Sequence, residues 1–115
     1  MNIPRYEEEG RVAVLYSPGY GAGWSSWADS SDKKEIFLFH PTLVKLVLEG
    51  RKEEITEDLC AKIFLENGIT DDYSYLGGLR DLRVGWVEKG VAFCVDEYDG
   101  YESIVLFSEA SYYIA

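Results

Sequence analysis

The chain of 115 residues is acidic, because 21 Asp and Glu residues outnumber 11 Lys and Arg residues and give a formal net charge of −10. The length is typical of one domain, and a hydrophobic fraction of 47% excludes a disordered acidic tail. This composition does not favour the large basic face that phosphate backbones or anionic lipids require. We therefore expect one folded domain, residues 1–115, that binds neither nucleic acid nor membranes directly.

The cysteines and the N-terminus indicate a reducing compartment. Cys60 and Cys94 lie within apolar runs, where a free thiol behaves as a small hydrophobic side chain. The N-terminal MNIPRYEEEGR lacks the basic region and apolar run of a signal peptide, and no apolar run approaches the ~20 residues that span a bilayer. We expect a cytoplasmic protein with two buried, structural cysteines.

The first predicted element is a strand at 11–17, RVAVLYS, which Pro18 and Gly19 end. From Ser17 to Glu35 the chain is rich in Gly, Ser, Asp and aromatic residues and shows no apolar period. A loop of this length is usually functional or mobile. A short apolar run, IFLF, follows it at 36–39.

Two helices are predicted next. Pro41 suits the first turn of a helix over about 41–49, whose apolar residues recur at helical spacing up to Gly50. A second helix has Thr56 as its N-cap, acidic residues in its first turn and Gly68 as its C-terminal stop.

Three further strands are predicted after the polar loop ITDDYSYLGG. Alternating apolar residues on both sides of the turn Glu88–Lys89–Gly90 predict a β-hairpin at 82–87 and 91–95, and a turn at Tyr98–Asp99–Gly100 leads to a strand at 103–107. We expect an α+β fold, in which the N-terminal strand and this three-stranded meander form one antiparallel sheet of about four strands, covered by the two helices.

The loop SPGYGAGWSSW contains an unusual alternation of glycines, Gly19, Gly21 and Gly23, directly after a predicted strand. Glycines of this kind let backbone N–H groups approach a phosphate, but both G-x-G-x-x-G and the Walker ending are absent. One hypothesis is therefore a site for a nucleotide-like or sugar-like ligand made by these glycines and Trp24.

The aromatic residues of the same loop favour a second hypothesis. Tyr20, Trp24 and Trp27 belong to the residue types that dominate interface hot spots. The competing structural interpretation is that Trp24 and Trp27 fold back to cap the sheet, while the glycines only permit tight turns.

Acidic residues gather at the predicted turn around Tyr98 and lack the register of a calcium loop. They either form part of an extended negative surface that attracts a basic partner, or serve solubility alone. The predicted partner-binding residues are Tyr20, Trp24, Trp27, Asp96, Glu97, Tyr98, Asp99 and Glu102. The same surface would include Glu53, Glu54, Glu57, Asp58, Asp71 and Asp72.

The sequence contains no complete catalytic or metal-binding set. His40, the single histidine, lies before a proline at a helix start, where a structural imidazole is the expected role. Two distant cysteines and one histidine do not make a zinc site, and no pair of carboxylates stands out for acid–base chemistry. We expect no enzyme activity, no metal and no cofactor.

Two segments, YSPGYGAGWSSW at 16–27 and the stretch 75–104, resemble small uncharacterised proteins of bacteriophages and mobile elements, which pair a G-x-G-W loop with a G-W-V-x-x-G hairpin and an E-Y-D-G turn. The matching positions are Gly21, Gly23, Trp24, Trp27, Gly85, Trp86, Glu97, Tyr98, Asp99 and Gly100. The resemblance implies no activity, but it implies a small phage-type protein acting in a bacterial host, many of which block a defence or nucleic-acid enzyme.

The leading functional prediction is a non-enzymatic protein-binding module. It would inhibit a host defence or nucleic-acid-handling enzyme, in the manner of an anti-CRISPR protein or DNA mimic, by placing a negative surface on a basic groove. The alternative is a protein that binds or sequesters a small ligand through the Gly/Trp-rich loop. An exposed edge strand could also pair two copies into a homodimer.

Overall fold

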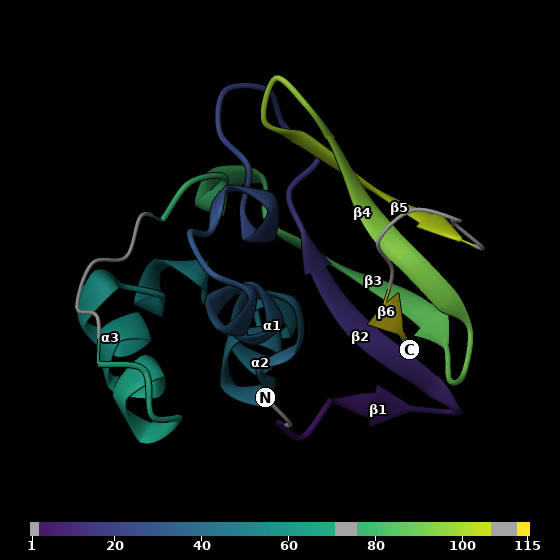
Figure 1. Ribbon diagram of the computed structural model, residues 1–115, viewed down its shortest axis with the longest axis horizontal. Coiled ribbons are helices and arrows are strands. Elements are labelled where there is room, and N and C mark those ends of the chain that lie inside the picture. The colour runs from purple at the N-terminus through teal and green to yellow at the C-terminus, as the bar shows by residue number, and fades with distance from the viewer. Residues whose placement is uncertain (1–2, 71–75, 107–112) are drawn as a thin grey trace.

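The strands and helices of the computed structural model form an α+β fold, as the sequence predicts (Figure 1). The structure describes residues 3–70, 76–106 and 113–115. The strands in this part of the chain are β1 (Glu7–Glu8), β2 (Arg11–Tyr16), β3 (Arg83–Glu88), β4 (Ala92–Tyr98), β5 (Tyr101–Leu106) and β6 (Tyr113–Ile114). The helices are α1 (Ser31–Phe39), α2 (Pro41–Leu48) and α3 (Glu57–Glu66), with short 3₁₀ helices η1 (Ser25–Trp27), η2 (Lys52–Glu54) and η3 (Leu79–Asp81).

The first sheet has the antiparallel order β1-β2-β3. Its central strand β2 carries the run VAVL, which is buried on both faces. All six residues of β2 pair with β3, from Arg11 opposite Glu88 to Tyr16 opposite Arg83. Continuous apolar strands of this kind are stable only between other layers of structure.

The second sheet has the antiparallel order β5-β4-β6. The two residues between β4 and β5 have positive φ angles, 49° at Asp99 and 83° at Gly100. A two-residue turn with both φ angles positive is type I′, whose twist matches that of the flanking strands. The outer edge of β5 is hydrogen-bonded near its start, where the Glu102 N–H donates to the Ser17 carbonyl at 2.9 Å. Homodimer formation through an edge strand stays a prediction.

The strands form two sheets, so the expectation of a single sheet with a three-stranded meander is wrong. β3 pairs with β2, whereas β4 pairs with β5 on one edge and with β6 on the other. The turn after β3 does not close a hairpin. Its Lys89 N–H donates to the Gly10 carbonyl, and its Gly90 N–H donates to the Ala115 carbonyl. The short β6 thus occupies the edge that a β3–β4 hairpin would need, which local patterning could not reveal.

The helices at 41–49 and 56–68 are confirmed as α2 and α3, and α1 is an additional helix that the sequence did not predict. Its apolar run IFLF is buried on every side, so it lacks the polar face that produces a helical period. The signal that was present is Ser30, whose hydroxyl accepts the Lys33 N–H as an N-cap. The predicted loop from Ser17 to Glu35 therefore ends where α1 begins.

The buried apolar side chains form one cluster between the helices and the sheets. Figure 1 shows α1 and α2 beside the strands, with α3 on their far side. The Phe37 and Phe64 rings, 5.6 Å apart, join α1 to α3. This core leaves the loop after β2 and the β4–β5 turn together at one end of the molecule (Figure 1).

Candidate functional site

The loop after β2 lies directly against the β4–β5 turn. The Gly21 N–H donates to the Asp99 carbonyl at 2.8 Å. Gly100 permits this approach, because a Cβ atom there would lie 2.4 Å from the Ala22 nitrogen and its φ is +83°. The structure thus brings together the two segments in which the sequence placed its candidate residues.

A buried carboxylate holds this loop in place. The side chain of Glu102 is completely buried, and its Oε1 accepts the Ser17 N–H at 3.0 Å. Its Oε2 accepts the Trp24 N–H at 2.8 Å, the Ser26 N–H at 2.9 Å and the Ser26 hydroxyl at 2.5 Å. Four donors satisfy the charge, which is the condition for burying a carboxylate without a partner cation.

Two predicted partner-binding residues, Glu102 and Trp24, are therefore in the interior. The Trp24 ring stacks at 4.3 Å from the Phe37 ring, and its Nε1–H donates to the Phe37 carbonyl at 2.7 Å. Trp24 is folded back into the interior, as the structural interpretation expected, but its ring packs on Phe37 of α1, and the prediction that Trp24 and Glu102 contact a partner is wrong. Glu102 was misplaced because a carboxylate beside a turn is usually exposed.

Two glycines of the loop, Gly19 and Gly23, pack closely against polar side chains of the protein itself. A Cβ atom on Gly19 would lie 2.0 Å from an Asp81 carboxylate oxygen, and one on Gly23 would lie 2.3 Å from the Ser26 hydroxyl. Glu102 already accepts three backbone N–H groups of the loop, those of Ser17, Trp24 and Ser26, so these donors do not bind a phosphate. Of the four residues in the predicted ligand site, only Gly21 is exposed.

Four aromatic side chains remain exposed around the junction. Tyr20 and Tyr98 are each 74% exposed and Trp27 is 42% exposed. Tyr101, which no sequence pattern singled out, lies opposite Tyr98 across the turn, with its ring centre 5.0 Å from that of Tyr20. The type I′ turn at Asp-Gly was the signal for this pairing, since it sets the two flanking tyrosines on one face.

Exposed carboxylates accompany these rings. Asp96, Glu97 and Asp99 lie on the surface, and none of them forms an ion pair with the described residues. Residues 12–32 and 90–115 contain no Lys or Arg at all. We call this region the aromatic–acidic surface, and its members are Tyr20, Trp27, Asp96, Glu97, Tyr98, Asp99 and Tyr101.

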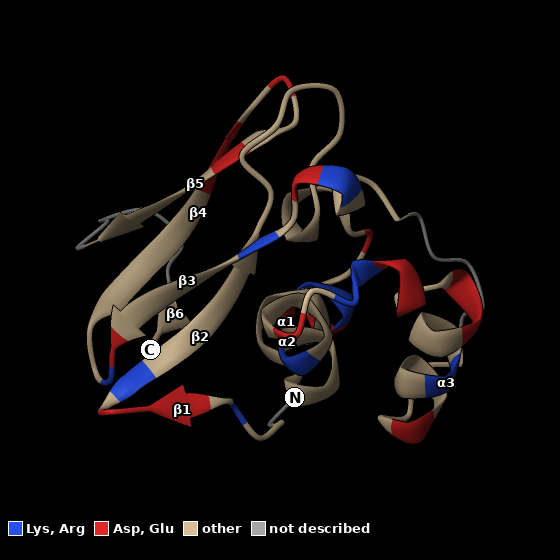
Figure 2. Ribbon diagram, turned by 180° about the vertical axis from the view of Figure 1, so that it is seen from behind, with Lys and Arg blue, Asp and Glu red and all other residues tan. Residues whose placement is uncertain are grey.

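The remaining acidic residues of the predicted negative surface lie in a separate region. Figure 2 shows acidic segments at the β4–β5 end and, apart from them, along η2 and the start of α3, with basic segments between. Glu53, Glu57 and Asp58 are exposed there, and Glu54 pairs with Arg51 at 2.5 Å. Asp71 and Asp72 lie outside the described residues.

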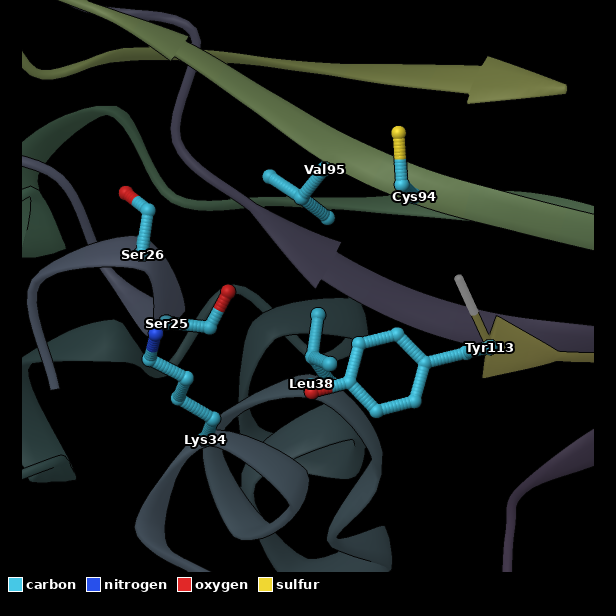
Figure 3. Close-up of a pocket in the computed structure, with 7 residues that line it drawn as sticks. All are labelled: Ser25, Ser26, Lys34, Leu38, Cys94, Val95 and Tyr113. Atoms are coloured by element: carbon cyan, nitrogen blue, oxygen red, sulfur yellow. The ribbon is translucent and has the colours of Figure 1, made fainter. Parts of the chain in front are cut away.

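Several hollows border the loop, and one of about 360 Å³ has Pro18, Arg83 and Tyr101 in its lining. An open one of about 410 Å³ is lined by Tyr20, Gly21, Trp27 and Asp99. A smaller one of about 190 Å³ lies on the inner side of η1, where Figure 3 shows Lys34, Tyr113 and both serines of η1. In that view the Cys94 sulfur points away from Lys34 and Tyr113. The lining of the smaller hollow offers no His or carboxylate as a base for a serine nucleophile.

The His40 side chain has a structural role. Its Nδ1 accepts the Thr42 N–H at 3.2 Å and so caps α2. Burial lowers the pKa of His40, and the nearby Glu66 carboxylate partly offsets that effect. The imidazole is therefore positioned to stabilise a helix start.

Both cysteines are buried free thiols, as predicted. Burial raises the pKa of the Cys60 thiol to about 12, and Glu57 adds to the effect. A thiol that stays protonated at neutral pH is a poor nucleophile.

Within the described residues, no three His, Cys, Asp or Glu side chains are grouped as ligands for a metal ion. None of the helices in that part of the chain is long and apolar enough to cross a membrane. Comparisons with protein-family models, with curated proteins and with solved structures find no match to this chain.

Proposed function

We propose that the protein is a non-enzymatic binding module that docks its aromatic–acidic surface onto a basic surface of a partner protein. The observation that carries this proposal is the junction of two segments that are far apart in sequence. It presents exposed rings beside carboxylates that form no ion pair with the described residues. Aromatic side chains supply contact area at low entropic cost, and carboxylates accelerate capture of a basic partner.

The partner of the expected chemistry is the basic groove of a nucleic-acid-handling enzyme. Such grooves carry Lys and Arg that neutralise phosphates, and a rigid acidic surface competes for the same side chains. An inhibitor of a defence enzyme in a bacterial host fits this chemistry and the resemblance to phage proteins. The anchoring of the loop by Glu102 supports the proposal, because preorganised surfaces lose less entropy on binding.

Small-ligand binding is the second candidate, and the open hollow at Tyr20 and Trp27 is the feature that favours it. A thermal-shift screen against nucleotides and sugars separates the two candidates, because only a ligand-binding protein is stabilised without a partner protein.

The first experiment compares proteins captured from bacterial lysate at low and high salt. The bait is the chain itself or the variant Asp96→Asn/Glu97→Gln/Asp99→Asn, which removes the exposed hairpin charge without touching Glu102. We expect a basic protein that the variant captures poorly. With that protein purified, association should slow roughly tenfold in the variant and with added salt, because steering depends on unscreened charge.

The matched control is Glu53→Gln/Glu57→Gln/Asp58→Asn, which removes the same number of exposed charges at the other acidic region. It should bind with an association rate within about twofold of the original. The proposal is overturned if both triple variants associate at the same rate, or if association is independent of salt.

A further inference from the structure

The open hollow beside Asp99 has the composition of a site for a planar cation. Its lining consists of two aromatic side chains, Tyr20 and Trp27, one carboxylate residue, Asp99, and a glycine, Gly21. The volume of about 410 Å³ falls in the range of binding pockets. Each of the three side chains has exposed surface, so an incoming group can reach them without any rearrangement of the core.

The shape of the hollow is held by contacts on both of its sides. Tyr20 leans on the Tyr101 ring at 5.0 Å. The Gly21–Asp99 backbone bond at 2.8 Å fixes the carboxylate residue beside the loop. Trp27 lies over Gly23, where a Cβ atom would come within 2.6 Å of its ring. A preformed hollow favours a ligand that matches it without reordering the loop.

We propose that this hollow receives an arginine side chain of the partner protein, an inference that deepens the proposed function and rests on it. A guanidinium group is planar and weakly hydrated, stacks on aromatic faces and bonds a carboxylate through two parallel N–H groups. A lysine ammonium is a strongly hydrated point charge and gains less from the rings. The protein itself uses such stacking, since the Arg5 guanidinium lies 3.9 Å from the centre of the Phe39 ring.

Charge complementarity indicates that the group bound in the hollow is positively charged. The loop and the hairpin contain no Lys or Arg, and Asp99 forms no ion pair with the described residues, so an incoming cation would meet an uncompensated carboxylate. Asp96 and Glu97 add negative potential nearby without lining the hollow. Arginine is therefore distinguished from lysine by the rings and Asp99, while the neighbouring acids act on both cations alike.

The test measures binding of two acetylated peptides of equal charge, hexa-arginine and hexa-lysine, at low salt. We expect hexa-arginine to bind about threefold more tightly, as for a stacked cation at a solvent-exposed site. In proton–nitrogen spectra its binding should shift the Trp27 indole signal and leave that of the buried Trp24 in place.

Four variants locate the site. Tyr20→Ala and Asp99→Asn should reduce the arginine preference to about one, and Asn is compatible with the left-handed backbone at Asp99. The matched controls Tyr98→Ala and Asp96→Asn change the same residue types on the same hairpin outside the hollow. They should weaken both peptides equally and preserve the preference.

Three results would overturn the inference. Equal binding of both peptides to the original protein removes the arginine site but leaves the acidic recognition surface standing. A preference that survives in Tyr20→Ala and Asp99→Asn places the arginine elsewhere. Absence of binding by either peptide at low salt contradicts the proposed function as well.

Discussion

Glu102 is the residue on which the candidate surface depends. Its carboxylate occupies the position that a phosphate takes in a glycine-rich phosphate loop, and it accepts backbone N–H groups from both ends of the loop. One of the glycines that suggest ligand binding in the sequence, Gly23, instead allows the loop to close around this internal anion, since a Cβ atom there would lie 3.1 Å from Glu102 Oε2. A glycine-rich loop after a strand can therefore stabilise the fold, when a carboxylate of the same chain accepts its backbone N–H groups.

Replacement of Glu102 by Gln should lower the free energy of unfolding by about 1–3 kcal/mol, because the amide nitrogen would face an N–H donor instead of accepting from it. Urea denaturation measures the change. Glu97→Gln is the matched control, since Glu97 lies directly opposite on β4 but is exposed, and it should change stability by less than about 0.5 kcal/mol. Equal effects of the two variants would show that Glu102 does not anchor the loop.

At the scale of elements, the starts of α2 and α3 were predicted from local signals, Pro41 and the Thr56 cap, whereas the start of α1 and the partners of β3 and β4 were not predicted. His40 and Thr56 cap α2 and α3 with side-chain acceptors, so the residues beside each helix start determine where it begins. The partners of β3 and β4 depend on β2 and β6, which lie far away in the chain. The exception is the β4–β5 hairpin, because Asp-Gly specifies its turn directly.

The cap at His40 predicts a pH dependence of stability. Burial places the folded pKa of His40 below the unfolded value of 6.5, so the unfolded chain binds more protons between these two values. The stabilisation is complete above pH 6.5 and declines as the pH falls toward the folded pKa.

The variant His40→Asn keeps a capping side chain and removes the titration. Acid should destabilise the original protein more than this variant. The free energy of unfolding of the original should therefore fall relative to that of His40→Asn as the pH is lowered from about 8 to about 5. Denaturation curves across this interval measure it. Parallel pH profiles for both proteins would contradict the assigned role of burial.

At the scale of the whole molecule, two of the acidic surface regions differ in how far their charge is compensated. The η2–α3 region contains the Arg51 ion pairs with Glu49 and Glu54, whereas the hairpin acids have no ion-pair partners among the described residues. Uncompensated charge of one sign destabilises a compact fold through self-repulsion. The aromatic–acidic surface is thus expected to reduce stability until a basic partner covers it.

Added sodium chloride should therefore stabilise the protein, by on the order of 1 kcal/mol between low and physiological ionic strength. Urea denaturation at the two salt concentrations tests this. The hairpin triple variant at Asp96, Glu97 and Asp99 should show a smaller salt effect than the original protein. Destabilisation by salt would mean that attractive ion pairs outweigh the repulsion.

Local sequence was sufficient to predict the α+β class, the strand at β2, the helices α2 and α3, the Thr56 cap and the hairpin turn at Asp99. These features depend on periodicity, capping and turn chemistry within a few residues. The burial of Trp24 and Glu102, the place of Tyr101 on the surface and the division of the strands into two sheets became clear from the three-dimensional structure alone. The physical reason is that burial and strand pairing depend on contacts between distant segments, such as Ser17 with Glu102, which no local pattern encodes.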